Sequence, residues 1–234
     1  MIATLVVACI AVIGVFIWVS YIPSVKIYSH NRIATNKKVI ALTFDDGPHP
    51  EITPKILDIL KKNSVKATFF VVGQNATKYP KILSEAFEQG HQIANHSNRH
   101  SYSIIKSPRS VLKDINEANE FIYKIIKEYP RFYRPPYGFR TLWGARAISK
   151  AGYKIITWDN MTYDYWGLKA NKLTLNILKR SKPGGVIVLH DGIEGMSSGN
   201  SSVIDALPAI IKQLKINGYK FVKLNELFNT NAYK

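Results

Sequence analysis

The chain contains almost no cysteine. Among its 234 residues the only one is Cys9, in an apolar N-terminal segment, so the rest of the chain cannot form an internal disulfide. A thiol nucleophile and a cysteine-ligated metal are therefore excluded from that remainder. The sequence also lacks internal repeats, low-complexity segments and zinc-finger spacings. Its length suits one domain of ordinary size with an appendage.

Acidic residues are scarce beside basic ones. Asp and Glu number 16 against 32 Lys and Arg, which gives a formal net charge of +16. Such a surplus suggests an anionic partner, which includes nucleic acid, a membrane surface and an anionic polymer such as a cell wall. The lysines are scattered, without the basic run typical of a nucleic-acid-binding arm, so we expect no nucleic-acid partner.

Residues 1–22 contain no charged side chain. At ~1.5 Å per residue this segment is long enough to cross the ~30 Å hydrocarbon core of a bilayer. Trp18 and Tyr21 stand where interfacial anchors are expected. The segment has no basic start, and no Ala-x-Ala site precedes Pro23. It therefore predicts a membrane anchor over residues 1–23, with a signal peptide that is cleaved for secretion as the alternative.

Residues 24–37 are polar and unpatterned and predict a linker, and residues 38–234 predict one globular domain. Basic residues follow the apolar segment, and the positive-inside rule alone would keep that side in the cytoplasm. Large domains can nevertheless translocate regardless of such charge, so the orientation depends on the substrate.

Apolar runs alternate with amphipathic segments throughout the domain. Short apolar runs predict seven strands, at 39–44, 67–72, 91–95, 132–134, 153–158, 185–189 and 220–222. Helical spacing of apolar residues predicts helices at 51–63, 78–89, 108–129, 143–151, 173–180 and 202–217. This alternation is typical of an α/β fold with a parallel sheet, either a barrel or a doubly wound sheet.

Polar residues that can carry chemistry gather at the ends of the predicted strands. They are Asp45, Asp46, His96, His100, Arg134, Asp159, Asp164 and His190. Because the carboxyl ends of parallel strands meet at one edge, we expect these groups to line one mouth.

A metal site and an acid–base pair follow from these residues. His96 and His100 are four apart, a spacing that on a helical turn puts both imidazoles on one face. With one carboxylate they make a three-ligand site suited to Zn²⁺, with the fourth position left to water. The second carboxylate could take a proton from the attacking water, and Arg134 could hold that base ionised. The residues alone do not say whether Asp45 or Asp46 is the ligand.

At the opposite side of the mouth, His190 could protonate a leaving amine, and Asp164 could orient and charge it. Aromatic residues close to these motifs could wall a sugar-binding groove. They are Tyr137, Trp158, Tyr163, Tyr165 and Trp166.

In this combination the sequence resembles the polysaccharide deacetylases, the family 4 carbohydrate esterases that share the chitooligosaccharide deacetylase homology domain. The resemblance covers about residues 38–228, and all five family motifs appear in order. It implies a distorted (β/α) barrel, commonly with seven strands, and a groove at the strand C-termini.

The resemblance also implies a role for each motif residue. Residues 43–48 match the first motif, in which Asp45 corresponds to the catalytic base and Asp46 to a metal ligand. His96 and His100 match the second motif and the two other ligands.

The third motif begins at Arg134, which is expected to pair with Asp45. In the same motif the Tyr137 N–H is expected to hold the oxyanion, and Pro136 and Tyr137 to contact substrate. The fifth motif supplies His190 as the general acid, with Val188 where the family usually has Leu.

The fourth motif departs from the family pattern. The family usually has Asp followed directly by Trp, whereas here Tyr165 stands between Asp164 and Trp166. Asp164 is the first choice as the partner of His190, and Asp159 is the alternative. Trp166 is expected to wall the pocket.

These roles imply metal-dependent hydrolysis of an N-acetyl group, with Zn²⁺ as the first candidate metal and Co²⁺ as the alternative. We expect the substrate to be N-acetylglucosamine in a cell-wall polysaccharide, with peptidoglycan first and chitooligosaccharide second. The rival hypotheses are an O-acetyl (xylan-type) esterase and a catalytically inactive wall-binding protein. A wall substrate predicts an extracellular domain on a single-pass anchor, and we expect a monomer.

Overall fold

The computed structural model describes residues 28–101, 107–164, 167–192 and 202–234, together with a few helical positions between residues 4 and 15. The predicted membrane segment and its flanking sequence therefore lie mostly outside the described residues. Among the residues that are described, no helix is long and apolar enough to span a membrane.

The described chain forms a sheet of nine strands, ordered β1-β6-β5-β4-β3-β2-β8-β7, with β9 paired to β2. Every pair of neighbouring strands is parallel. The strands are β1 (Ser29–His30), β2 (Val39–Asp45), β3 (Thr68–Val71), β4 (Gln92–Asn95), β5 (Phe132–Tyr133), β6 (Lys154–Ile156), β7 (Asn160–Met161), β8 (Gly185–His190) and β9 (Lys220–Val222).

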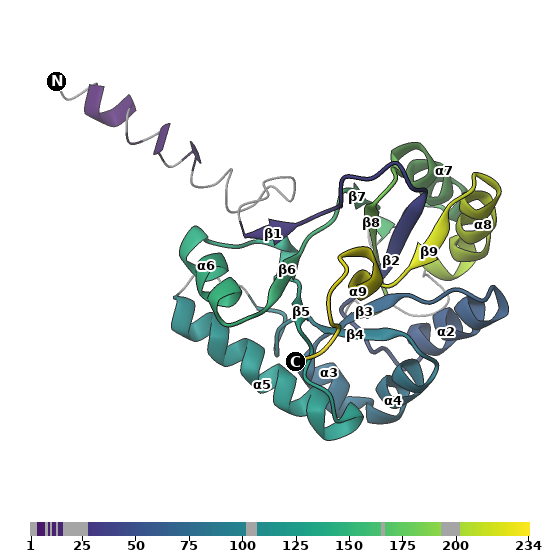
Figure 1. Ribbon diagram of the computed structural model, residues 1–234, viewed down its shortest axis with the longest axis horizontal. Coiled ribbons are helices and arrows are strands. Elements are labelled where there is room, and N and C mark those ends of the chain that lie inside the picture. Colours follow the sequence, from purple (N-terminus) through teal and green to yellow (C-terminus); the bar gives the residue numbers. More distant parts are fainter. Residues whose placement is uncertain are drawn as a thin grey trace.

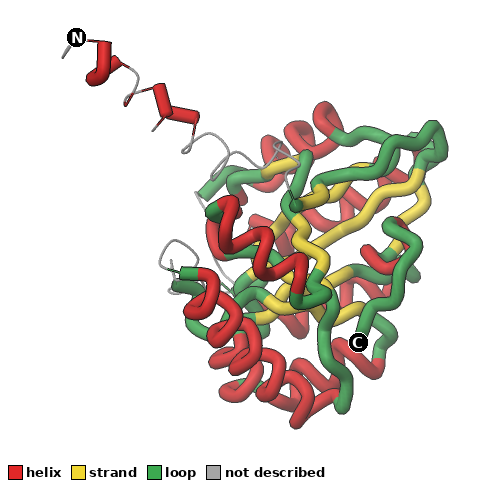
Figure 2. Tube along the Cα trace, turned by 60° about the vertical axis from the view of Figure 1, so that its left-hand side comes forward, coloured by secondary structure: helices red, strands yellow, loops and turns green. Residues whose placement is uncertain are grey.

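The sheet curls into a distorted barrel, surrounded by helices (Figure 1). The helices are α2 (Ile52–Lys62), α3 (Gly73–Lys78), α4 (Pro80–Glu88), α5 (Pro108–Ile126), α6 (Leu142–Lys150), α7 (Ala170–Arg180), α8 (Ser202–Ile216) and α9 (Leu224–Leu227). Figure 2 shows the same arrangement from another side, with helices outside the strands. The predicted α/β barrel is confirmed, because the sheet is parallel and curled and helices cover its outer face.

Successive side chains of β2 point alternately into two hydrophobic clusters, one on each face of the sheet. Ile40, Leu42 and Phe44 belong to the cluster that packs the sheet against the helices. Ala41 belongs to a second cluster, with residues from β3, β4, β8 and α9. Since successive side chains of a strand point to opposite faces, Asp45 continues the face of Ala41 and points into the barrel.

Two strands and two short helices were not predicted. β1 lies within the predicted linker and pairs with β6, and β7 pairs with β8. Both strands have two residues, too few for an alternating pattern to show in the sequence. The predicted helix over 78–89 is α4, whereas α3 and α9, of six and four residues, are too short for a helical period to show in the sequence.

Candidate active site

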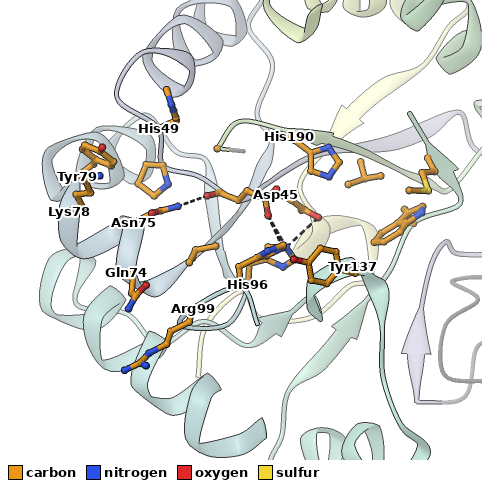
Figure 3. A pocket seen from close by; sticks show the side chains of 18 residues that line it. Asp45, His49, Gln74, Asn75, Lys78, Tyr79, His96, Arg99, Tyr137 and His190 are labelled. Atoms are coloured by element: carbon orange, nitrogen blue, oxygen red, sulfur yellow. Dashed lines mark hydrogen bonds and ion pairs between the residues drawn. The ribbon is translucent and has the colours of Figure 1, made fainter. Parts of the chain in front are cut away.

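A cavity of about 670 Å³ opens at the carboxyl ends of the strands. It runs from the barrel mouth toward α3 and α4 (Figure 3). Its lining residues are Asp45, Asp46, Pro48, His49, Val72, Gln74, Asn75, Lys78, Tyr79, His96, Arg99, His100, Tyr137, Trp158, Met161, Val188, His190 and Gly192. The predicted polar strand ends therefore do gather at one mouth.

Asp45 forms a buried ion pair with Arg134. Asp45 is the last residue of β2, and Arg134 follows β5. One Asp45 oxygen, Oδ1, lies 2.5 Å from Arg134 Nη1, and both side chains are almost fully buried. A guanidinium this close fixes the position of the carboxylate. Asp45 thereby presents a carboxylate in one orientation at the cavity wall.

The guanidinium is fixed by further contacts inside the barrel. Its Nη1 also donates to the Thr43 hydroxyl at 2.9 Å, and Nε and Nη2 each lie 3.3 Å from a carbonyl oxygen, of Ile156 and Thr157 respectively. The face of Phe70 lies 4.0 Å from its central carbon. These contacts hold the Arg134 guanidinium in one orientation. Through the ion pair, they also fix the position of the Asp45 carboxylate.

Asp46, His96 and His100 form a second cluster beside this pair. His96 Nε2 lies 3.3 Å from Asp46 Oδ1, and His100 Nε2 lies 3.0 Å from the same oxygen. The three potential ligand atoms lie within 4.8 Å of one another. The two histidines are on a loop after β4 and not on the helical turn that their spacing predicts. The loop bends through Ser97 and His100, whose φ values are +70° and +49°.

The cluster fits a divalent cation. His96 Nδ1 lies 2.8 Å from the carbonyl oxygen of Arg134. A carbonyl can only accept, so Nδ1 carries the proton, and in the neutral ring the Nε2 lone pair faces Asp46. Asp46 Oδ1 is buried and accepts no hydrogen bond of good geometry among the described residues. Convergent nitrogens around an unsatisfied oxygen are the donor set that Zn²⁺ takes.

Electrostatics also favour a cation at this point. Burial opposes ionisation of Asp46, but the imidazoles of His100 and His96 outweigh it and hold the pKa of Asp46 well below its usual range. Burial likewise opposes a charge on His96, but Asp45 and Asp46 outweigh it and raise the pKa of His96. The two carboxylates thus stabilise positive charge between them, whether it is a proton or a metal ion.

The turn that carries Asp46 is held by residues that the sequence analysis did not single out. Asp46 has a φ of +75°, and its carbonyl accepts a 2.7 Å hydrogen bond from Asn75 Nδ2. Any side chain at Gly192 would meet that carbonyl, because a Cβ there would lie 2.2 Å from the oxygen. In the sequence, only the Asp-Gly pair after His190 could have indicated this support for the Asp46 turn. The same pair is equally typical of an ordinary turn.

Asp191 is a buried carboxyl behind the same turn. It accepts a hydrogen bond from the Thr53 hydroxyl at 2.6 Å and another from the Gly47 N–H at 3.2 Å. Burial raises the pKa of Asp191 to about 7, and the Asp46 and Asp45 carboxylates add to the effect. Asp191 therefore links α2 to the residues that carry both functional carboxylates.

His190 and Asp164 form a pair at the other side of the cavity. His190 Nδ1 lies 2.8 Å from Asp164 Oδ1, and the His190 N–H donates to Asp164 Oδ2 at 2.8 Å. The alternative partner, Asp159, instead accepts a 2.7 Å hydrogen bond from the Val186 N–H, near the start of β8. The structure thus places Asp164, and not Asp159, beside His190.

The predicted substrate contacts have different outcomes. Tyr137 is 45% exposed, with its ring centroid 4.6 Å from that of His100, and it lines the cavity. Pro136 is buried and absent from the lining, because in this 3-10 turn, Pro136–Gly138, only Tyr137 is exposed. This predicted contact is therefore not supported. Trp158 lines the cavity, while Trp166 lies outside the described residues.

Comparison with known proteins decides the family. A family model for polysaccharide deacetylase matches residues 32–156, more than half of the chain. The chain belongs to the polysaccharide deacetylase family. The family that the sequence predicted is therefore confirmed, and the protein is a hydrolase of the polysaccharide deacetylase type.

Several relatives of this deacetylase are similar over most of its length. A peptidoglycan-N-acetylglucosamine deacetylase of Bacillus cereus is 39% identical over 196 residues, which cover 84% of this chain and 70% of the relative. A chitooligosaccharide deacetylase of Azorhizobium caulinodans is 31% identical, over 80% of this chain and 93% of the relative.

A solved structure resembles this fold closely. It is a peptidoglycan N-acetylglucosamine deacetylase crystallised with a naphthyl-substituted N-oxidanyl-benzamide. The TM-score is 0.82 at 37% sequence identity, and the match covers 88% of this chain and 94% of that chain.

Proposed function

We propose that the protein hydrolyses the N-acetyl group of N-acetylglucosamine residues in peptidoglycan and releases acetate. The observation that carries this proposal is the convergence of three groups on one cavity. These groups are the Asp45–Arg134 pair, the Asp46–His96–His100 cluster and the His190–Asp164 pair. The relatives named for the same reaction on peptidoglycan support the choice of substrate.

Asp46, His96 and His100 would hold the divalent cation, with Zn²⁺ as the first candidate and Co²⁺ as the alternative. Such an ion, when bound, polarises a carbonyl and lowers the pKa of an attacking water. The absence of cysteine from the domain and the presence of two imidazoles with one carboxylate agree with this choice of metal.

Asp45 is the proposed base. It takes the proton of the attacking water, and Arg134 keeps the carboxylate oriented for that transfer. The Tyr137 N–H is the proposed donor to the oxyanion, since this residue forms the exposed point of the turn beside His100. Losing one such donor typically costs about 3–4 kcal/mol of barrier.

His190 is the proposed acid. As the bond between the acetyl carbon and the nitrogen breaks, the leaving nitrogen takes a proton from a protonated His190, so that it departs as the neutral amine. Burial opposes a charge on His190, but Asp164 outweighs it and, with Asp46 and Asp45, raises the pKa of His190 to about 9. The imidazolium is therefore present at neutral pH, as an acid requires.

The alkaline limb of kcat against pH should accordingly lie above the ordinary histidine value of ~6.5 in the wild type, because the Asp164 carboxylate raises the pKa at which His190 loses its proton. In Asp164→Asn the main charge that stabilises the imidazolium is gone, so the limb should move down toward the ordinary histidine value of ~6.5. Asp159→Asn is the matched control and should leave the limb in place. An unmoved limb in Asp164→Asn would exclude His190 as the acid.

The experiment that tests the proposal is a measurement of acetate release by the purified protein. The substrates are peptidoglycan, N-acetylglucosamine oligomers and O-acetylated xylan. Release mainly from peptidoglycan is expected. Preferential release from the oligomers would favour a chitooligosaccharide deacetylase, and release from xylan alone an O-acetyl esterase. Binding to wall material without release from any substrate would indicate an inactive wall-binding protein.

A wall substrate requires the domain to be outside the cell. We therefore propose a single-pass anchor over residues 1–23 with the domain, a monomer, on the extracellular side. Reporter fusions at the C-terminus test this orientation, and a cytoplasmic reporter would contradict the peptidoglycan hypothesis.

A further inference from the structure

The cavity is much longer than the chemistry needs. The Asp45–Arg134 pair and the metal cluster occupy one end, at the barrel mouth. The other end extends along α3 as far as Tyr79 (Figure 3). A volume of about 670 Å³ lies within the range of sites that bind whole drug-sized ligands. The far end is therefore available to the parts of the polymer that flank the reacting sugar.

The far end differs from the mouth in its charge. It is lined by Gln74, Asn75, Lys78 and Tyr79, and by Arg99 from the loop after β4. The acidic lining residues of the described cavity, Asp45 and Asp46, both stand at the mouth. The far end thus offers two cations and neutral hydrogen-bonding groups to a ligand, and no carboxylate.

The two cations have no carboxylate partner among the described residues. Neither Lys78 nor Arg99 forms an ion pair there, and the Lys78 ammonium lies 5.2 Å from the centroid of the Tyr79 ring. Asp114 and Glu117 stand behind Arg99, and the charge of Arg99 opposes the rise that burial causes in the pKa of Asp114, but neither carboxylate forms an ion pair with Arg99 among the described residues. Asp114 accepts from the Asn98 N–H at 3.1 Å, and Glu117 accepts from the Asn98 side chain at 3.0 Å.

The elements that carry the two cations are joined to each other. The first N–H groups of α3, at Gly73 and Gln74, donate to the carbonyls of Ser97 and Asn98, next to Arg99. A Cβ at Gly73 would lie 2.6 Å from the Asn98 side chain, so only glycine allows this approach. Asn75 then connects α3 to the carbonyl of Asp46. The backbone segments that carry the two cations are thus held in place beside the metal cluster.

We propose that Lys78 and Arg99 form a subsite for a carboxylate on the glycan, beside the sugar that is deacetylated. This inference rests on the proposed function and deepens it. Two cations in a groove select an anionic substituent over a neutral one by charge complementarity. The substrate class is then an N-acetylated glycan with carboxylate-bearing substituents, and a neutral chitin-type chain is the poorer ligand.

The test compares kcat/KM for charged and neutralised forms of the same polymer. The charged forms are peptidoglycan strands that keep their peptides and strands stripped of peptides, whose sugars then expose a lactyl carboxylate. In the neutralised forms the carboxylates are converted to methylamides. Exposed ion pairs contribute about 0.2–1 kcal/mol each, so two of them predict a charged-to-neutral ratio between about two and about thirty.

The double variant Lys78→Gln/Arg99→Gln should bring this ratio close to one, mainly through KM. Lys81→Gln is the matched control, since this exposed lysine is outside the cavity lining, and it should keep the ratio of the wild type. Raised salt should reduce the ratio in the wild type but not in the double variant. A preference confined to strands with peptides assigns the carboxylate to the peptide; a preference shared by stripped strands assigns it to the sugar.

A ratio of one in the wild type, or an unchanged ratio in the double variant, would overturn the subsite and leave acetate release intact. Absence of acetate release from every form would instead overturn the proposed function. The two failures are therefore distinguishable in a single set of assays.

Discussion

Asp45→Asn is expected to reduce kcat for acetate release from peptidoglycan by about 10²–10⁴-fold, the typical contribution of a general base. The amide cannot take a proton from water, although it keeps the shape of the carboxylate. The metal content should remain that of the wild type, because Asp45 Oδ2 lies 3.9 Å from His96 Nε2 and the other oxygen is engaged by Arg134.

The same substitution should also lower stability. Arg134 is fully buried, and its counter-charge disappears in the variant. Breaking a buried pair by removing one partner typically costs about 3–5 kcal/mol. Thermal unfolding should therefore show a lower Tm, and kinetics must be recorded well below it. Asp205→Asn, at an exposed position of α8, is the matched control and should change neither quantity. Activity within tenfold of the wild type in a folded Asp45→Asn protein would refute the assignment of the base.

Asp46→Asn should lose the metal and the activity together. Its Oδ1 is the point on which both imidazoles converge, and an amide oxygen is a weaker ligand without the charge. Removing a residue that only hydrogen-bonds to a metal ligand typically lowers metal affinity or activity by about 10–100-fold. Removing a direct ligand should therefore lower both by more than that. Zinc content by mass spectrometry and acetate release are the two measurements.

Chelation of the wild type should have the same effect, and addition of Zn²⁺ or Co²⁺ should reverse it. Addition of metal should not restore Asp46→Asn at equal concentration, whereas Asp58→Asn, on the exposed face of α2, should behave as the wild type throughout. Full activity of the chelated protein, with zinc shown to be gone, would contradict metal dependence. Together the two variants distinguish the two roles. Asp45→Asn should lose activity and keep the metal, whereas Asp46→Asn should lose both.

The sequence by itself determined the architecture and the location of the site. Seven of the strands and most helices follow from local periodicity. Because polar residues stood at the ends of predicted parallel strands, the sequence also determined that Asp45, His96, Arg134 and His190 would meet. The family motifs then gave each residue an expected role. All of this information is contained in short stretches of neighbouring residues.

Apart from what the family resemblance implied, only the tertiary structure decided which residues are partners. Asp45 and Asp46 are adjacent and chemically identical, yet the alternation of β2 turns Asp45 toward Arg134, 89 positions away, while Asp46 turns toward the histidines. The choice of Asp164 over Asp159 rests on a contact across 26 positions. The cations Lys78 and Arg99 are ordinary surface residues in the sequence and become neighbours of one cavity only in the fold. Such contacts depend on how distant segments of the chain pack together, and the local sequence pattern does not predict that packing.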